Sequence, residues 1–288
     1  REAEIAPVQI HLTRRSVPVR GIASPMVVVY GFLIIAAIGT GILLLPVSNN
    51  TGEVTPFLTA LFTAVSAVTV TGLVVVDSAT YWSEFGQAAI LVLIFVGGLG
   101  FMTSAAFLLL LMGQRLGLQN QLAIREGLGV SQLGGLAQLV RNIVIVAIVF
   151  QFIGSFALFM RWYVTDSLWA GISLQEALWQ SVFHSASSFN NAGFIIFPPD
   201  KIAGESVTAF SGDYVVLSIV GLLILLGGIG YVAMYEVVTV RRPSRLSVDT
   251  KVILVGTIAL LFGGAALVFA TEFNRAETLE ERTVSDKL

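Results

Sequence analysis

The chain has 288 residues, of which 56% are hydrophobic and only 12% charged, and its formal net charge is −2. Soluble domains carry about 25% charged residues. Together with a mean hydropathy of +0.87, the composition predicts an integral membrane protein and excludes an ordinary soluble domain. The absence of cysteine excludes disulfides, thiolate catalysis and cysteine-based metal sites.

The chain begins with a charged tail, residues 1–25, in which the first 20 residues are too polar for a signal peptide, so no cleaved leader is expected. Five later segments are long and apolar enough to span a bilayer, for which about 20 residues are needed. They are Met26–Pro46, Gln87–Met112, Asn142–Trp162, Tyr214–Val240 and Val252–Ala270.

Two further segments, Phe57–Val76 and Ala177–Phe197, are apolar but carry several polar residues, and they align with each other. When Gly72 is placed on Gly193, Phe62 also matches Phe183 and Ser66 matches Ser187 (both pairs 121 residues apart). Irregular backbone at membrane depth survives only where protein buries it or where it lines a watery cavity. The repeat therefore predicts two re-entrant pore loops, with a glycine kink in a buried helix as the alternative for either loop alone.

The distribution of basic residues favours this topology. If both polar segments enter and leave from outside, the basic pieces 1–25, 113–141 and 241–251 all lie in the cytoplasm. If only the first segment spanned, the inside loop would be Asp77–Gly86, which has no lysine or arginine, and the positive-inside rule disfavours that arrangement.

The expected fold is an all-α membrane protein built from repeated units of helix, re-entrant pore loop and helix. The first unit is residues 26–112 and the second is 142–240, joined by the linker 113–141, and the loop 241–251 leads to 252–288, the start of a third unit. Since the sequence stops after an outer helix, we expect it to be part of a longer protein.

The re-entrant segments have the chemistry of an ion-selectivity filter. The C-terminal end of a pore helix carries partial negative charge that favours a cation. The backbone carbonyls of the following residues can replace the ion's water shell, and glycine can turn such a carbonyl inward because it reaches positive φ freely. The candidate ion-lining residues are Thr69, Val70, Thr71, Gly72 and Leu73 in the first copy and Asn190, Asn191, Ala192, Gly193 and Phe194 in the second. Because neither stretch contains an acid, we expect a monovalent, weakly hydrated ion.

Each inner helix carries a glycine motif, Gly97-Gly-Leu-Gly-Phe101 in the first copy and Gly227-Gly-Ile-Gly-Tyr231 in the second. The motif lies within a span and lacks the strand–turn–helix context of a nucleotide fingerprint. We expect these glycines to let the inner helix approach the pore helix closely, with a hinge as the alternative. The motif glycines are Gly97, Gly98, Gly100, Gly227, Gly228 and Gly230.

Three polar residues near the loops have open roles. His184 lies in the second pore helix where the first copy has Thr63, so a hydrogen bond to a neighbouring helix is expected rather than proton chemistry. Asp77 and Asp200 follow the two filters and would concentrate cations at an outer mouth, or they are ordinary loop residues.

Several motifs resemble the Trk/Ktr/HKT superfamily of potassium transporters. They are Thr69-Val-Thr-Gly-Leu73, Gly97-Gly-Leu-Gly-Phe101 and Asn190-Asn-Ala-Gly-Phe194, each in its place between apolar helices. The run Arg14–Pro46 and the loop Gly113–Gly135 are most similar to the bacterial Ktr-type membrane subunit. Only two of the family's four filters are present, and the third inner helix is absent.

The resemblance implies a potassium pathway formed by four such units around one pore. Potassium would be bound through backbone carbonyls near Val70, Thr71, Gly72, Asn191, Ala192 and Gly193. Gly72 stands where some sodium-selective relatives carry serine, which favours potassium, while sodium remains possible as a coupling or regulatory ion.

The resemblance also implies a homodimer in the lipid of a bacterial plasma membrane, with a cytoplasmic N-terminus, docked on a cytosolic nucleotide-binding ring. We expect no covalently bound cofactor and no nucleic-acid partner. The alternatives are a secondary transporter for another small solute and a fragment that is inactive without its missing half. An intramembrane enzyme is poorly supported, since the chain has two histidines and no paired acids within a span.

Overall fold

The structure, a computed structural model, describes residues 25–100, 103, 136–165, 168–169, 171–202, 207–240 and 242–273. Within these ranges the regular elements are helices, and an isolated bridge between Asn49 and Trp82 is the extent of β pairing. The expected cytoplasmic tail, most of the expected linker 113–141 and the end of the chain lie outside the described residues.

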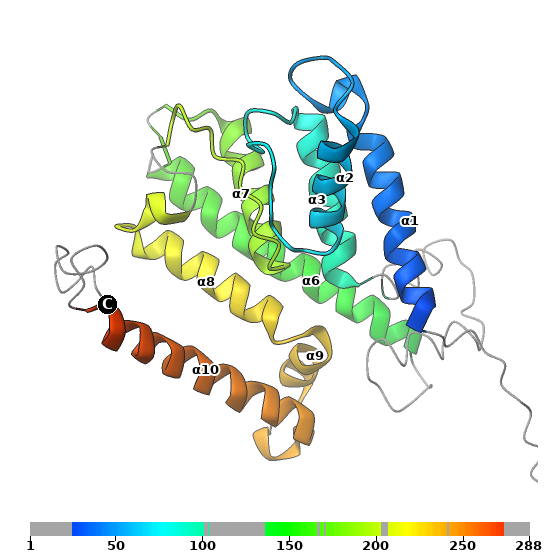
Figure 1. The fold of residues 1–288 in the computed structure, drawn as a ribbon. Helices are drawn as coiled ribbons and strands as arrows, with labels where there is room; N and C mark the ends of the chain where they lie inside the picture. Colours follow the sequence, from blue (N-terminus) through cyan, green and yellow to red (C-terminus); the bar gives the residue numbers. More distant parts are fainter. Residues whose placement is uncertain are drawn as a thin grey trace, which may run out of the picture.

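The first group of helices contains α1 (Pro25–Leu43), α2 (Phe57–Val68) and α3 (Glu84–Leu99), with a short 3₁₀ turn at Pro46–Ser48 after α1. All three helices pack on one another, and α2 is a short helix followed by extended backbone (Figure 1). The segment expected as a re-entrant loop, Phe57–Val76, is therefore a helix over its first part and non-helical after Thr69–Val70.

The second group repeats this arrangement with α6 (Leu136–Phe159), α7 (Leu174–Phe189) and α8 (Tyr214–Gly228). A π-helical turn, Met160–Val164, continues α6, and a 3₁₀ turn, Val207–Phe210, precedes α8. The three helices pack on one another, and α7, like α2, is followed by an extended segment (Figure 1). Contacts between α3 and α7 join the two groups.

The chain then continues through α9 (Tyr231–Thr239), a 3₁₀ turn at Pro243–Arg245 and α10 (Val248–Glu272), which packs against α9. By length and composition, two described helices can cross a membrane: Ala137–Val164 and Val248–Glu272. The apolar side chains of α10 are largely exposed, with Leu260 at 79%. These faces fit a protein whose helices contact lipid or further protein.

The expected span Tyr214–Val240 is not one helix. It is broken between α8 and α9, whose axes differ by 100°. The break falls at Gly230, which has φ of +86°, and the matching residue of the first group, Gly100, ends α3 with φ of +79°. A positive φ interrupts a right-handed helix, and glycine adopts it without steric cost. The third glycine of each motif is therefore a helix terminator.

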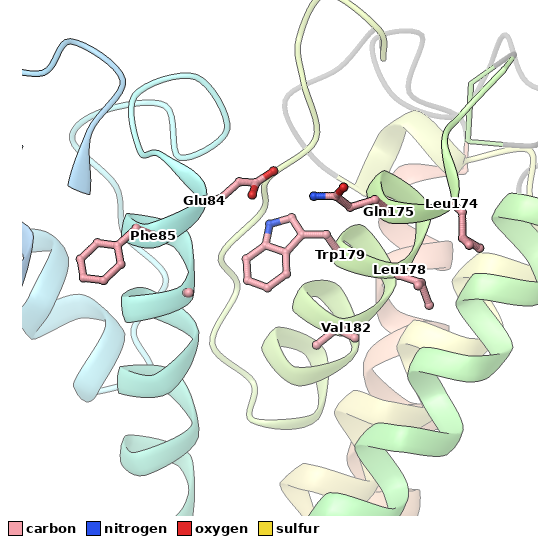
Figure 2. Close-up of a pocket in the computed structure, with 8 residues that line it drawn as sticks. Glu84, Phe85, Leu174, Gln175, Leu178, Trp179 and Val182 are labelled. Carbon is pink, nitrogen blue, oxygen red and sulfur yellow. The ribbon is translucent and has the colours of Figure 1, made fainter. Parts of the chain in front are cut away.

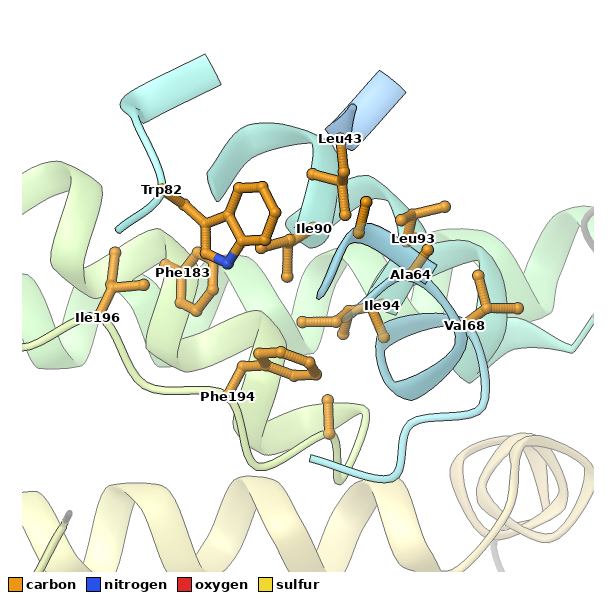
Figure 3. Packing of buried hydrophobic residues seen from close by; sticks show 13 residues of the cluster. Leu43, Ala64, Val68, Trp82, Ile90, Leu93, Ile94, Phe183, Phe194 and Ile196 are labelled. Atoms are coloured by element: carbon orange, nitrogen blue, oxygen red, sulfur yellow. The ribbon is translucent and has the colours of Figure 1, made fainter. Parts of the chain in front are cut away.

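A shared hydrophobic core lies between the two groups. Figure 3 shows Ile90 and Ile94 of α3 beside residues of α2, with Phe183 of α7 packed under Trp82. Phe194, from the extended segment after α7, belongs to the same cluster and is 1% exposed. The two groups thus form one packed body, and the second extended segment is part of its core.

The first turn of α7 is fixed by a capping box. The Ser173 hydroxyl accepts a hydrogen bond from the Glu176 amide, and the Glu176 carboxylate accepts from the Ser173 amide. Lys201 lies 2.9 Å from the same carboxylate. The Lys201 hydrogen bond, together with those from Ser173, lowers the pKa of Glu176 to about 2. The loop after the second extended segment is thereby tied to the start of α7.

The first glycine of each motif lies against the end of the preceding short helix. A Cβ atom on Gly97 would overlap the carbonyl oxygen of Val68, and one on Gly227 would overlap the carbonyl oxygen of Phe189. Val68 and Phe189 are the last residues of α2 and α7. In contrast, nothing lies within 4 Å of a Cβ built on Gly100 or Gly230.

We expect Gly227→Ala to lower the melting temperature of the detergent-solubilised protein, because overpacking against a fixed carbonyl costs about 1–3 kcal/mol. Gly221→Ala is the matched control, since Gly221 lies in the same helix with nothing within 4 Å of its Cβ position. Equal effects of the two variants would contradict the close approach of α8 to the end of α7.

Glu176→Gln should lower the melting temperature slightly at neutral pH. The pair is exposed, so its contribution is at most about 1 kcal/mol. Since the folded pKa of Glu176 is lowered, this contribution is present above the unfolded pKa of about 4.3 and is lost as pH falls to about 2. Melting temperatures of both proteins across this range should converge at low pH, and a difference that stayed constant with pH would contradict this contribution.

Candidate functional site

The extended segment after α2 begins with two unusual backbone turns. Val70 has φ of +47° and Gly72 has φ of +78°. A positive φ at a β-branched residue such as valine is a genuine outlier, and it persists only where the surrounding structure holds it in place. The amide of Thr71 donates to the carbonyl of Ser66 at 2.9 Å, which turns the chain back along α2.

The segment after α7 has the same conformation at the aligned positions. Asn191 has φ of +57° and Gly193 has φ of +76°. The amide of Ala192 donates to the carbonyl of Ser187 at 2.8 Å. The two copies therefore share alternating left-handed residues and the same backbone bond, although their sequences differ at most of these positions.

A buried serine on each short helix holds the segment that follows. The Ser66 hydroxyl donates to the carbonyl of Leu73 at 2.7 Å, and the Ser187 hydroxyl donates to the carbonyl of Phe194, also at 2.7 Å. The two serines are the aligned pair noted in the sequence. Their identity in both copies was a usable signal, but the alignment alone did not indicate what they bind.

The polar side chains of the two segments make different contacts. The hydroxyls of Thr69 and Thr71 lie 2.6 Å apart, and Thr69 also donates to a carbonyl of α2. The Asn190 amide donates to the carbonyl of Ala186 in α7 at 2.8 Å. The Tyr231 hydroxyl donates to the carbonyl of Gly98 at 3.2 Å, which links the two inner-helix motifs.

The second segment has an extra pair of braces, Gln180 and His184, both buried in α7. The Gln180 amide donates to the carbonyl of Ile196 at 2.9 Å, and His184 Nε2 accepts from the amide of Ile196 at 3.3 Å. His184 Nδ1 lies 2.8 Å from the carbonyl of Gln180. The expected bond from His184 to a neighbouring helix is therefore wrong: its partners are its own helix and the extended segment.

The two extended segments meet at their glycines. A Cβ on Gly72 would overlap the carbonyl oxygen of Ala192, and one on Gly193 would lie 3.6 Å from the Cα of Gly72. A cavity of about 480 Å³ opens beside this contact. Its lining residues are Gly72, Val74, Val75, Val76, Asp77, Ser78, Gly193 and Ile195. The predicted glycines are therefore brought together at one hollow.

One acidic residue is among those that line this cavity. Asp77 lines the cavity, and its carboxylate also accepts hydrogen bonds from the amides of Ala79 and Thr80, at 3.0 and 2.7 Å. Among the described residues, no group of three or more histidine, aspartate or glutamate side chains could hold a metal ion. Apart from Asp77, the residues that line the cavity carry no charge.

The chain matches the protein family described as a cation transport protein, TrkH, over residues 5–260. It belongs to this family of membrane cation transporters. Among similar proteins is the Ktr system potassium uptake protein B of Bacillus subtilis, 36% identical over 92% of this chain. The potassium/sodium uptake protein NtpJ of Enterococcus hirae and the Ktr system potassium uptake protein B of Vibrio alginolyticus are each 34% identical over 90% of the chain.

The chain spans little more than half the length of these relatives. The matched regions cover 56% of the Bacillus protein and 54% of each of the other two. The relatives are named as uptake proteins rather than enzymes, in agreement with the absence of an enzymatic motif from the sequence. The membership agrees with the resemblance that the filter and glycine motifs predicted.

Ser187→Ala should destabilise the protein by about 1–3 kcal/mol, because it leaves the buried carbonyl of Phe194 without its donor. Ser66→Ala should cost less, because Leu73 is 60% exposed and water can replace the lost donor. Ser181→Ala is the control, since this buried hydroxyl donates to Ala177 within the hydrogen-bond ladder of its own helix, and it should cost less. Melting temperatures in detergent test this, and equal losses at all three serines would contradict a specific bracing role.

Proposed function

We propose that the chain is the potassium-translocating part of a membrane uptake protein, and that the two extended segments are filter loops that strip the ion of water. The supporting observation is the repeated backbone geometry: left-handed residues at Val70 and Gly72 recur at Asn191 and Gly193, beside one cavity. Two unrelated kinks would have no reason to share both the positive φ values and the serine brace.

The chemistry of this geometry favours a monovalent cation. The last residues of α2 and α7, Val68 and Phe189, directly precede the extended segments, so the partial negative charge of both helix ends is directed toward the ion. Carbonyl dipoles can replace the hydration shell of potassium. Magnesium and calcium are instead held chiefly through carboxylates and retained water, and neither filter segment contains an acidic residue.

Two segments surround an ion only in part. We propose that the complete protein supplies two more units, so that residues 26–112 and 142–240 form the first two of four quarters and 252–288 begins the third. The matched regions cover little more than half of each relative, which supports this division. In this topology α2 and α7 are re-entrant helices entering from outside, and the N-terminus lies in the cytoplasm of a bacterial cell.

Partners follow from the same relationship. We propose a homodimer of the complete subunit in the plasma membrane and a cytosolic nucleotide-binding ring as its regulator. The name of the Bacillus relative, a Ktr system protein, supports an assembly with more than one component. The name of the Enterococcus relative includes sodium as well as potassium, so sodium as a second transported or coupling ion belongs in every transport assay.

Gly72→Ser in the complete protein should reduce the preference for potassium over sodium by about tenfold, equivalent to about 1.4 kcal/mol of differential binding. A side chain there would meet the carbonyl oxygen of Ala192 and strain a residue at positive φ. Rubidium and sodium uptake by a potassium-uptake-deficient bacterium measures this change.

The matched control is Gly52→Ser, which has the same type of backbone (φ of +71°) with nothing within 4 Å of its Cβ position. It should leave selectivity unchanged. If the Gly72→Ser variant were expressed normally and selected potassium over sodium as well as the wild type does, the assignment of this segment as a filter would be wrong.

A further inference from the structure

A groove outside the ion site runs between α3 and α7, where the two groups of helices meet. It has a volume of about 660 Å³ and is lined mainly by apolar side chains. Figure 2 shows Leu178 and Val182 on the α7 wall and Phe85 on α3, with the Trp179 indole between the helices. The Trp179 Nε1 donates to Gln87 Oε1 at 2.7 Å, which fixes the indole in the groove.

The groove continues toward the other end of the helices. A second hollow of about 340 Å³ shares Val182 with the first and extends between α3 and α6, past Phe95 and Phe152. From Glu84 to Phe95 the hollow follows eleven residues of α3, about 16 Å at ~1.5 Å per residue. That length is close to half of the ~30 Å hydrocarbon core of a bilayer, which is the reach of one acyl chain.

Charged and amide groups lie at one end of this groove. Figure 2 shows Glu84 and Gln175 pointing toward each other across its mouth. Both side chains are exposed, and neither has a hydrogen-bond or ion-pair partner among the described residues. Lys201, the basic residue attached to this end of α7, is already paired with Glu176. Among the described residues, the mouth therefore offers a carboxylate without an ion-pair partner and an amide without a hydrogen-bond partner.

We propose that the groove holds an acyl chain of a zwitterionic amine phospholipid, of the phosphatidylethanolamine type, from the outer leaflet. The ammonium of the headgroup meets the Glu84 carboxylate, a phosphate oxygen accepts from the Gln175 amide, and the chain covers Leu178, Val182 and the indole of Trp179. An anionic phospholipid would place its negative charge against Glu84 and is disfavoured. The leaflet assignment rests on the topology proposed above.

This occupant matches the apolar wall of the first hollow and the polar groups at its mouth. The apolar wall would be costly to expose to water, and lipid chains match its chemistry and its length. Tryptophan is enriched at membrane interfaces, where its ring is apolar and its N–H is polar. The lipid would also fill the junction between the two groups of helices, so that bilayer composition influences how the two units pack.

Quenching of tryptophan fluorescence by brominated lipid tests the proposal directly. The complete protein is reconstituted in vesicles that contain phosphatidylethanolamine or phosphatidylglycerol with dibrominated acyl chains. The difference between the wild type and Trp179→Phe isolates the emission of Trp179. We expect stronger quenching of this emission by phosphatidylethanolamine, and Glu84→Gln should reduce that preference about two- to fivefold, the worth of one exposed charge pair.

Val182→Phe, at the junction of the two hollows, should weaken the quenching by either lipid. Val149→Phe is its control, since Val149 is 47% exposed on α6 and does not line the groove. The proposal is wrong if Trp179 is not quenched, as when a second copy or a later part of the chain covers the groove. It is also wrong if quenching is unchanged by both Glu84→Gln and Val182→Phe, which indicates bulk lipid contact.

Rubidium uptake measured on the same vesicles separates this proposal from the proposed function. Wild-type transport without quenching of Trp179 rejects the lipid site alone. If Trp179 is still quenched in Gly72→Ser, the lipid site is supported. The selectivity of the same variant then tests the filter assignment separately.

Discussion

The packing of the two extended segments depends on how their backbone groups, which lie outside a helix, find hydrogen-bond partners within an apolar protein. An unpaired backbone group in such surroundings costs several kcal/mol. Here each short helix supplies the partners for the segment that follows it: a backbone carbonyl and a side-chain hydroxyl of Ser66 in one copy, and those of Ser187 in the other. These bonds hold each extended segment against its helix.

The inner helices complete the support by close approach. Gly97 and Gly227 leave room for the last carbonyl groups of α2 and α7. The helical backbone is then interrupted at Gly100 and at Gly230. The glycines of one motif therefore have two different physical tasks, contact and termination. The extended segment after α7 is further held by Gln180 and His184, for which the first copy has the smaller Thr59 and Thr63.

Much of this could be predicted from residue patterns, because apolar length, glycine spacing and the internal repeat are local properties of the chain. Helical content and the family agree with what the sequence predicted, while the filter role of Gly72 and Gly193 stays a prediction. The break in Tyr214–Val240 was missed because hydropathy does not register backbone conformation. The partners of His184 were missed because Ile196, twelve residues away, becomes its neighbour only when the segment after α7 turns back along the helix.

We propose that potassium passes between the carbonyls of the two segments. Anomalous diffraction from crystals of the complete protein grown in rubidium or thallium tests it most directly. We expect cation density on the axis faced by Val70–Gly72 and Asn191–Gly193. Cation density confined to other parts of a transport-competent protein, with none beside these carbonyls, would contradict it.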